Sequence, residues 1–332
     1  MRDLNLLGPW IRRFLLEHLV AERNLSHNTQ ISYRDTLSLL LPFAGTKMRK
    51  SVDRLNVFDI SPGVIRSFLE TIESVRNCSV ATRNQRLGAI HSLAKFIGMR
   101  SPEHVSWCAE VRSIPFKKSA KPMIGYLDKP EMDALLNQPL RSTGQGARDY
   151  ALLLFLYNSG ARADEAAGLT IDCVQVGTSP CVRILGKGNK LRLCPLWPLT
   201  VAALKPLISD RDGKDRVFLG RTGDPMTRFG IHRLVTTYAA LALGNQKPLK
   251  CTRVSPHTIR HTTAVHLLRA GVDINTIRAW LGHVSIDTTH IYAEVDLEMK
   301  AKALASVNIE SLPKPSSKRG SNKSVMTFLS TL

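Results

Sequence analysis

Apolar residues recur at helical spacing through the first 110 residues, and this periodicity constrains the fold more than any other feature. In the first segment the recurring residues are Trp10, Ile11, Phe14, Leu15 and Leu19. Helix starts are marked by Pro9, by Ser26 with Thr29, by Ser61-Pro62 and by Ser79. The last of these opens a helix over Val80–Ile97 that ends at Gly98. No strand is predicted in this region, so the chain begins with a small helical domain.

Beyond Leu127 the pattern changes to helices interrupted by one hairpin. The short segments Cys181–Leu185 and Lys190–Pro195 flank Gly186-Lys-Gly-Asn189, which is typical of a β-hairpin turn. Helices are predicted from Asp128-Lys-Pro-Glu131 onward and over Arg148–Ser159, Thr227–Leu243, Pro256–Ala270, Asp273–Leu281 and Ser285–Tyr292. The sequence therefore predicts a mainly α fold with a small β-sheet or hairpin.

The length of 332 residues favours about two domains. A boundary is indicated by Arg112–Pro122, which contains two prolines, four basic residues and no acidic residue. We therefore expect a helical domain over residues 1–111, a linker over 112–122 and a second domain over 123–310. Residues 311–332 form a tail with four basic residues and no acidic residue, and within it Val325–Leu329 is an apolar stretch that could pack on a partner.

The net charge of +19 predicts a polyanionic partner, with DNA or RNA first and an anionic membrane surface second. Residues 1–118 carry +8 and the remainder +11, so both domains are expected to contact the polyanion. The longest apolar runs, such as Ala151–Tyr157, are far shorter than the roughly 20 residues of a membrane span. No secretory signal is recognised, and the six cysteines show no Cys-x-x-Cys pair, which favours reduced thiols and a cytoplasmic location. A phosphate-binding Gly-x-x-x-x-Gly-Lys-Ser/Thr loop is absent from the sequence.

The candidate chemistry is densest in Pro256-His257-Thr-Ile-Arg260-His261. Residues three apart share a helix face, so His257 and Arg260 project together. A histidine that moves a proton beside an arginine that binds an oxyanion suits phosphoryl transfer. Four further candidates are Arg162, Lys187, His283 and Tyr292. Each alone has an ordinary explanation: a surface arginine paired with Glu165, a turn lysine, a capping histidine and a half-buried tyrosine.

Taken in order, these candidates make the chain resemble the tyrosine recombinase (phage integrase) family, and within it the compact Xer-like members. The resemblance rests on Asn158–Leu169, Ile184–Pro195, Ser255–Ala270, Leu281–Val295 and, near the start, Asn24–Tyr33 and Ala81–Ile97. One departure is Ala161-Arg162-Ala163-Asp164, where the family usually has Leu before the Arg and Ser before the Glu. The resemblance implies a helical SAM-like core-binding domain followed by a mixed α/β catalytic domain.

The same resemblance implies a role for each candidate. Arg162 and Arg260 would bind the non-bridging phosphate oxygens, and Tyr292 would be the nucleophile that forms a 3′-phosphotyrosine. Lys187 would protonate the departing 5′ oxygen, with Lys190 as the next candidate. His257 would assist as acid or base, His283 would hydrogen-bond the phosphate, and Glu165 would orient its neighbours. No metal or other cofactor is expected, and His261 and His266 are interpreted as structural.

The resemblance also implies a clamp around double-stranded DNA, with no separate amino-terminal arm-binding domain. Family members act as a tetramer on two DNA sites, a dimer on each, so a helix over Glu298–Ile309 is expected to dock on a neighbour. Candidate DNA contacts are Arg83, Arg86, Lys117, Lys118, Arg228, His232 and Arg233.

Three functions remain open at this point. The first is a site-specific recombinase of a mobile element, and the second a Xer-type resolvase of chromosome dimers. The third is a sequence-specific DNA-binding protein that has lost catalysis. The tail and the departure around Arg162 favour the first over the second. The intact set of six candidate catalytic residues argues against the third.

Overall fold

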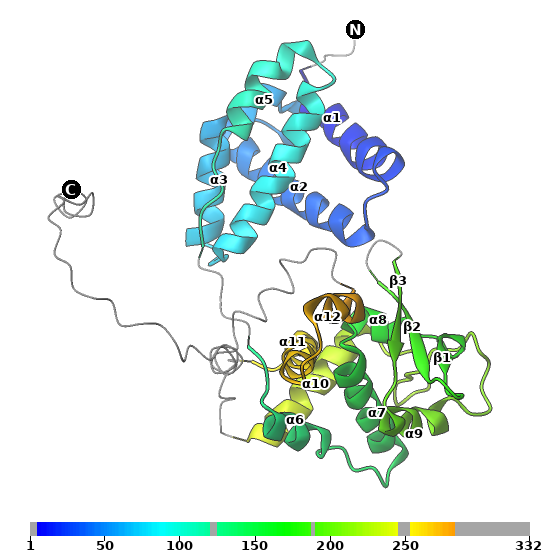
Figure 1. The fold of residues 1–332 in the computed structure, drawn as a ribbon. Coiled ribbons are helices and arrows are strands. Elements are labelled where there is room, and N and C mark those ends of the chain that lie inside the picture. The colour runs from blue at the N-terminus through cyan, green and yellow to red at the C-terminus, as the bar shows by residue number, and fades with distance from the viewer. Residues whose placement is uncertain (1–4, 120–124, 187–189, 245–252, 283–332) are drawn as a thin grey trace, which may run out of the picture. The chain divides into compact units, whose positions relative to one another are not determined.

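The structure, a computed structural model, describes residues 5–119, 125–186, 190–244 and 253–282. The chain divides into two compact units, Met1–Pro122 and Met123–Leu332 (Figure 1). Each unit contains its own cluster of buried apolar side chains. No helix in the described ranges combines the length and apolar composition needed to cross a membrane.

The first unit is helical throughout its described residues. Its order is α1 (Leu7–Arg13), a π-helical segment (Phe14–Glu22), α2 (His27–Met48), α3 (Pro62–Ser74), α4 (Val80–Gly98) and α5 (Val105–Arg112), with 3-10 turns at Val52–Arg54, Val57–Asp59 and Pro102–His104. Two predicted starts carry real caps, because the hydroxyls of Ser61 and Ser79 accept from the amides of Val64 and Thr82. Trp10, Phe14 and Phe96 pack against one another in the core.

The second unit places seven helices, over its described residues, beside one small sheet. The helices are α6 (Lys129–Leu136), α7 (Gly144–Ser159), α8 (Ala163–Ala167), α9 (Pro198–Ile208), α10 (Arg228–Leu243), α11 (Pro256–Arg269) and α12 (Ile274–Leu281), with a 3-10 turn at Ile171–Cys173. The antiparallel sheet has the order β1 (Val174–Gln175), β2 (Cys181–Leu185) and β3 (Leu191–Pro195). Ile184 lies opposite Arg192, and Val182 opposite Cys194. The middle and end of α7 are buried on all sides, so this helix forms the centre of the unit.

The predicted fold class, mainly α with a small β-sheet, is confirmed. Three elements are additional: α5, β1 and α9. Helix α5 buries only Trp107 and Val111, so it shows little periodicity, and α9 has Pro198 at its start and Pro206 near its end. The predicted helices over Ser285–Tyr292 and Glu298–Ile309 lie outside the described residues. The cysteines of the described ranges carry free thiols.

Candidate active site

Arg260 connects the ends of two helices beneath the site. Ser255 caps α11, and Pro256 occupies its first position, so the helix begins one residue before His257. The Arg260 side chain is buried, and its Nη1 and Nη2 atoms each donate a bond of 2.6 Å, to the carbonyls of Gly160 and Leu281. These carbonyls stand at the C-terminal ends of α7 and α12, where the helix dipoles favour a cation. The guanidinium is therefore fixed before any ligand binds.

Gly160 is required by this arrangement, which leads to a first prediction. It ends α7 with a φ of 58°, and an added Cβ would lie 2.4 Å from Cδ2 of the fully buried Leu281. Gly160→Ala is expected to reduce the free energy of unfolding by about 3 kcal/mol or more, from left-handed strain plus overpacking. Urea unfolding of the variant and of wild type measures this loss of stability. Gly271→Ala is the matched control, because Gly271 has a φ of 84° with nothing within 4 Å of an added Cβ. Equal losses in the two variants would contradict the overpacking argument.

Arg162, Glu165 and Arg192 form a second buried charge group. Arg162 precedes α8, and its Nη1 lies 2.7 Å from Glu165 Oε1 while its amide donates to Oε2. The other partner of Oε2 is Arg192 of β3, whose Nη2 lies 2.7 Å away. The side chains of Glu165 and Arg192 are only 5% and 7% exposed, whereas that of Arg162 is 32% exposed. One carboxylate thus holds two guanidiniums, and only Arg162 still faces solvent appreciably.

The charge state of Glu165 follows from these contacts. Burial alone would raise its pKa, but hydrogen bonds from Arg192 and Arg162 and the charge of Arg192 lower the pKa to about 2. The carboxylate is therefore ionised at any pH at which the protein works. It acts as an acceptor that orients both arginines.

Glu165→Gln is expected to lower the free energy of unfolding near pH 7 by about 3 kcal/mol, from the pKa difference between 4.5 and about 2. Because the pKa is depressed in the folded state, this stability is complete above pH 4.5 and is lost as the pH falls toward 2. Urea unfolding at a series of pH values between neutral and acid checks it. The difference in the free energy of unfolding between Glu165→Gln and wild type should shrink as the pH falls. Asp164→Asn, which changes a 62% exposed neighbour, is the control. A difference that stays constant through the acid range would contradict the assignment.

His257 is exposed and lies three residues before Arg260 on α11, and Arg260 in turn bonds to the carbonyl of Gly160, two residues before Arg162. Its pKa is lowered by loss of hydration and by the charges of Arg260, Arg162 and His232, against a smaller opposing effect of Glu165. A neutral imidazole next to cationic side chains can accept a proton near pH 7. The pKa of His261 is lowered to about 4, chiefly by burial, so this ring remains neutral.

The three residues of α10 that are predicted to contact DNA have different surroundings. Arg228 lies 3.4 Å from Asp164 and stacks on Phe229, while His232 and Arg233 are exposed. Helix α10 packs against α8 and α11, the helices that carry Glu165 and His257. Thus α10 adds positive charge next to the site.

The two arginines of the first unit that are predicted to contact DNA form hydrogen bonds within that unit. Arg83 is 6% exposed, and its Nη1 donates to the carbonyl of Pro115. Arg86 donates to the carbonyl of Ser32 and the hydroxyl of Thr36. These bonds involve only Nη1 of each guanidinium. Arg83 is buried and presents little surface that DNA could contact, so its prediction as a DNA contact conflicts with its placement.

The predicted linker starts against the first unit. Lys117 pairs with Glu73, and its backbone exchanges hydrogen bonds with the side chain of Asn84. Ile114 is part of the core of this unit. Lys118 is exposed and follows this tied segment. Residues as far as Lys117 therefore belong structurally to the first unit.

Three candidate catalytic residues, Lys187, His283 and Tyr292, lie outside the described residues. Their neighbours Gly186, Lys190 and Gly282 are described. The amide of Gly186 donates to the carbonyl of Lys190, which closes the hairpin. Gly282 ends α12 with a φ of 66°. The described residues that precede Lys187 and His283 in the sequence, Gly186 and Gly282, also lie close to Arg192.

Sequence reasoning missed Arg192 as a member of the site. The only signal was its position on β3, because it shares a face with the buried Val182, Ile184 and Cys194. A charge in an apolar row indicates a buried partner, here Glu165. No group of three His, Cys, Asp or Glu side chains in the described ranges is arranged to hold a metal.

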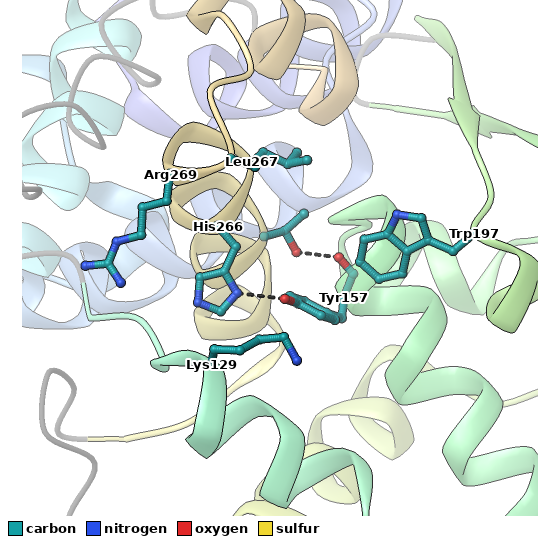
Figure 2. A pocket seen from close by; sticks show the side chains of 8 residues that line it. Lys129, Tyr157, Trp197, His266, Leu267 and Arg269 are labelled. Carbon is teal, nitrogen blue, oxygen red and sulfur yellow. Dashed lines mark hydrogen bonds between the residues drawn. The ribbon is translucent and has the colours of Figure 1, made fainter. Parts of the chain in front are cut away.

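A pocket of about 500 Å³ lies toward the other end of α11 (Figure 2). Its floor contains Tyr157, whose hydroxyl lies 2.7 Å from Nδ1 of His266. Burial is the main cause that raises the pKa of Tyr157, to about 12, and it lowers the pKa of His266. Both groups are therefore neutral. The pair supports the packing of α7 on α11 rather than the arginine group.

Comparisons with known proteins agree with this geometry. Residues 125–299 match the Phage integrase family, and residues 11–100 match the Phage integrase N-terminal SAM-like domain. The chain is 38% identical over 304 residues to putative integrase/recombinase y4rC of Sinorhizobium fredii, covering 91% of this chain and 92% of the relative. It is 32% identical over 304 residues to tyrosine recombinase XerD of Chlorobaculum tepidum, covering 87% and 93%.

Among solved structures, the post-cleavage complex of the XerH site-specific recombinase with palindromic difH substrate has the same fold. The TM-score is 0.66 at 21% identity, over 86% of this chain and 81% of that one. The family matches together span most of the sequence, and they include the arginine groups described above. The chain therefore belongs to the phage integrase family and is a tyrosine recombinase.

Proposed function

We propose that this recombinase cleaves and rejoins double-stranded DNA at specific sites through a 3′-phosphotyrosine formed by Tyr292, without metal or ATP. The observation that carries the proposal is the placement of Arg162 and Arg260 around one spot. The guanidinium of Arg260 bonds to the carbonyl of Gly160, two residues before Arg162, and His257 lies three residues before Arg260 on α11, so the three residues belong to one site. Arg162 and Arg260 are also held by separate supports, Glu165 for one and two helix ends for the other.

The chemistry follows from the charge of a phosphodiester. Its anionic oxygens repel nucleophiles, so catalysis requires neutralisation of the charge that develops on the phosphorane. Arg162 is partly exposed and provides a guanidinium fork for the non-bridging oxygens. Arg260 is buried with both Nη atoms bonded to carbonyls, so it contributes through its fixed positive charge. The Tyr292 oxygen forms a bond to phosphorus as the bond to the 5′ oxygen breaks, and Lys187 donates a proton to that oxygen. His257, as acid or base, accepts the phenolic proton of Tyr292 during cleavage and returns it during rejoining. His283 donates a hydrogen bond to the phosphate. Rejoining reverses these steps, because the phosphotyrosine conserves the bond.

We assign DNA binding to both units, Met1–Pro122 and Met123–Leu332. The excess of positive charge in each half of the sequence supports this assignment. Lys117, Lys118, Arg228, His232 and Arg233 remain the proposed contacts, together with Arg86. We also propose a tetramer on two DNA sites, in which Glu298–Ile309 docks on a neighbouring subunit.

A mobile-element role is the first biological proposal, and resolution of chromosome dimers is the second. The relative described as a putative integrase/recombinase supports the first, at 38% identity over nearly the whole chain. The relative named XerD supports the second, at 32% identity. Identification of the cognate DNA distinguishes them, because an element recombinase acts at the ends of that element.

One experiment tests the proposed reaction. Cognate duplexes are enriched from a random pool by binding, and a nicked version is incubated with the protein in EDTA. A nick lets the short strand leave after cleavage, so the covalent protein–DNA complex accumulates. A complex that resists denaturant supports the proposal. Specific binding with no covalent complex would instead support a DNA-binding protein that has lost catalysis.

A further inference from the structure

Arg192 contacts three parts of the site at once, although it is not among the six candidate catalytic residues. Its Nη2 pairs with Glu165, which also holds Arg162. A Cβ added to Gly186, the residue before Lys187, would lie 3.4 Å from Arg192 Nη1. A Cβ added to Gly282, the residue before His283, would lie 3.1 Å from Arg192 Cδ and 3.3 Å from Nη1. One buried side chain therefore bonds to the partner of Arg162 and lies close to the residues that precede Lys187 and His283.

We propose that Arg192 is a positioning residue that sets the hairpin and the end of α12 against Arg162 during DNA cleavage. The proposal rests on the recombinase reaction proposed above. Its physical basis is the shape of the guanidinium, which is flat, rigid and permanently charged. One edge bonds to Glu165, and the atoms on its other side lie against the backbone at Gly186 and Gly282. A shift of the guanidinium would therefore move these segments together.

The choice of residue type supports a role beyond packing. The neighbouring inward positions of the sheet are Val182, Ile184 and Cys194, so an apolar side chain would fit the pattern. Replacement of a buried ion pair by apolar residues is often neutral for stability, so stability alone does not call for a charge here. A charged group at this place instead fixes the orientation of Glu165 and, through it, of Arg162.

The test compares Arg192→Met and Arg192→Lys with wild type in the nicked-site assay, with protein in excess over DNA. Arg192→Met is expected to slow formation of the covalent complex by about 100-fold, because small displacements of reacting groups carry losses of that order. Affinity for the cognate duplex should change by less than about threefold, because Arg192 is buried. Arg192→Lys keeps a charge for Glu165 and so maintains the fold, yet it should remain at least about tenfold slow because it lacks the fork.

The matched control is Arg183→Met, on the same hairpin. Arg183 lies on β2 opposite Leu193, on the other face of the sheet, and donates to the carbonyl of Asp172. Its rate should equal that of wild type. All rates are measured below the melting temperature of each variant, so that a purely structural role would leave the rate per folded molecule unchanged.

Coupling to Glu165 provides a second readout. If Arg192 acts through Glu165, the double variant Arg192→Met/Glu165→Gln should be slower than the slower single variant by less than about threefold. A double variant whose loss of rate equals the product of the two single losses would overturn this coupling. A wild-type rate in folded Arg192→Met and Arg192→Lys would overturn the positioning role while leaving the proposed function intact. Failure of wild type itself to form the complex would count against the proposed function.

Discussion

Tyr292→Phe is expected to abolish the covalent protein–DNA complex while specific DNA binding remains. The substitution removes one oxygen, the atom proposed to attack phosphorus, and leaves the ring and every cation of the site in place. Loss of a nucleophile that starts a covalent pathway should reduce the cleavage rate by at least about 10³-fold. The measurement is denaturing electrophoresis of labelled, nicked cognate DNA in EDTA, together with a binding assay under native conditions.

Tyr238→Phe is the matched control for the tyrosine. The Tyr238 hydroxyl donates to Asp149 at 2.8 Å, within the part of the second unit formed by α7 and α10. Its removal should lower stability without affecting cleavage by the folded protein. A covalent complex that persists in Tyr292→Phe would assign the nucleophile to another residue. Loss of DNA binding in the same variant would make the Tyr292 hydroxyl part of the binding surface.

Helix positions could be predicted because their signals are local. Ser61, Ser79 and Ser255 each place a hydroxyl where the first free amides of a helix need an acceptor. Gly160 and Gly282 end helices because they adopt positive φ values. By contrast, α9 contains two prolines, which conceal a helix when they stand at its first and last turns. Strand β1 has only two residues and forms only because β2 lies beside it.

The residues of the candidate site differ in the same way, because some follow from local sequence patterns and others do not. The segments that contain Arg162, His257 and Arg260 have recognisable patterns in the sequence. Glu165, the partner of Arg162, lies only three positions away, and this pair is visible in the sequence. The partners of Arg260 and the second partner of Glu165 come from distant positions, so no local pattern reveals them. Arg260 bonds to residues 100 and 21 positions away, and Glu165 bonds to Arg192, 27 positions away. For the same reason the burial of Arg83 could not be predicted, because its partner Pro115 lies 32 positions later.

Arg260→Ala is expected to lose both catalysis and stability, whereas Arg162→Ala should lose mainly catalysis. Each removes a guanidinium proposed to neutralise the phosphorane, and each should slow cleavage by about 10³-fold or more. Arg260→Ala also leaves the buried carbonyls of Gly160 and Leu281 without that donor, which should reduce the free energy of unfolding by about 2–5 kcal/mol. Arg162 is partly exposed, and Glu165 keeps Arg192 when it is removed.

Arg260→Lys separates the two contributions at Arg260. A lysine retains the charge but presents a single ammonium in place of two amino groups set at a fixed angle. It can reach one of the two helix ends, so about half of the lost stability should return, as measured by urea unfolding. Cleavage should stay at least about 10²-fold slow, because a lysine ammonium is not held in the same place by two helix ends. Cleavage at the wild-type rate in Arg260→Lys would show that charge alone suffices, and the helix-end contacts of Arg260 would then serve stability only.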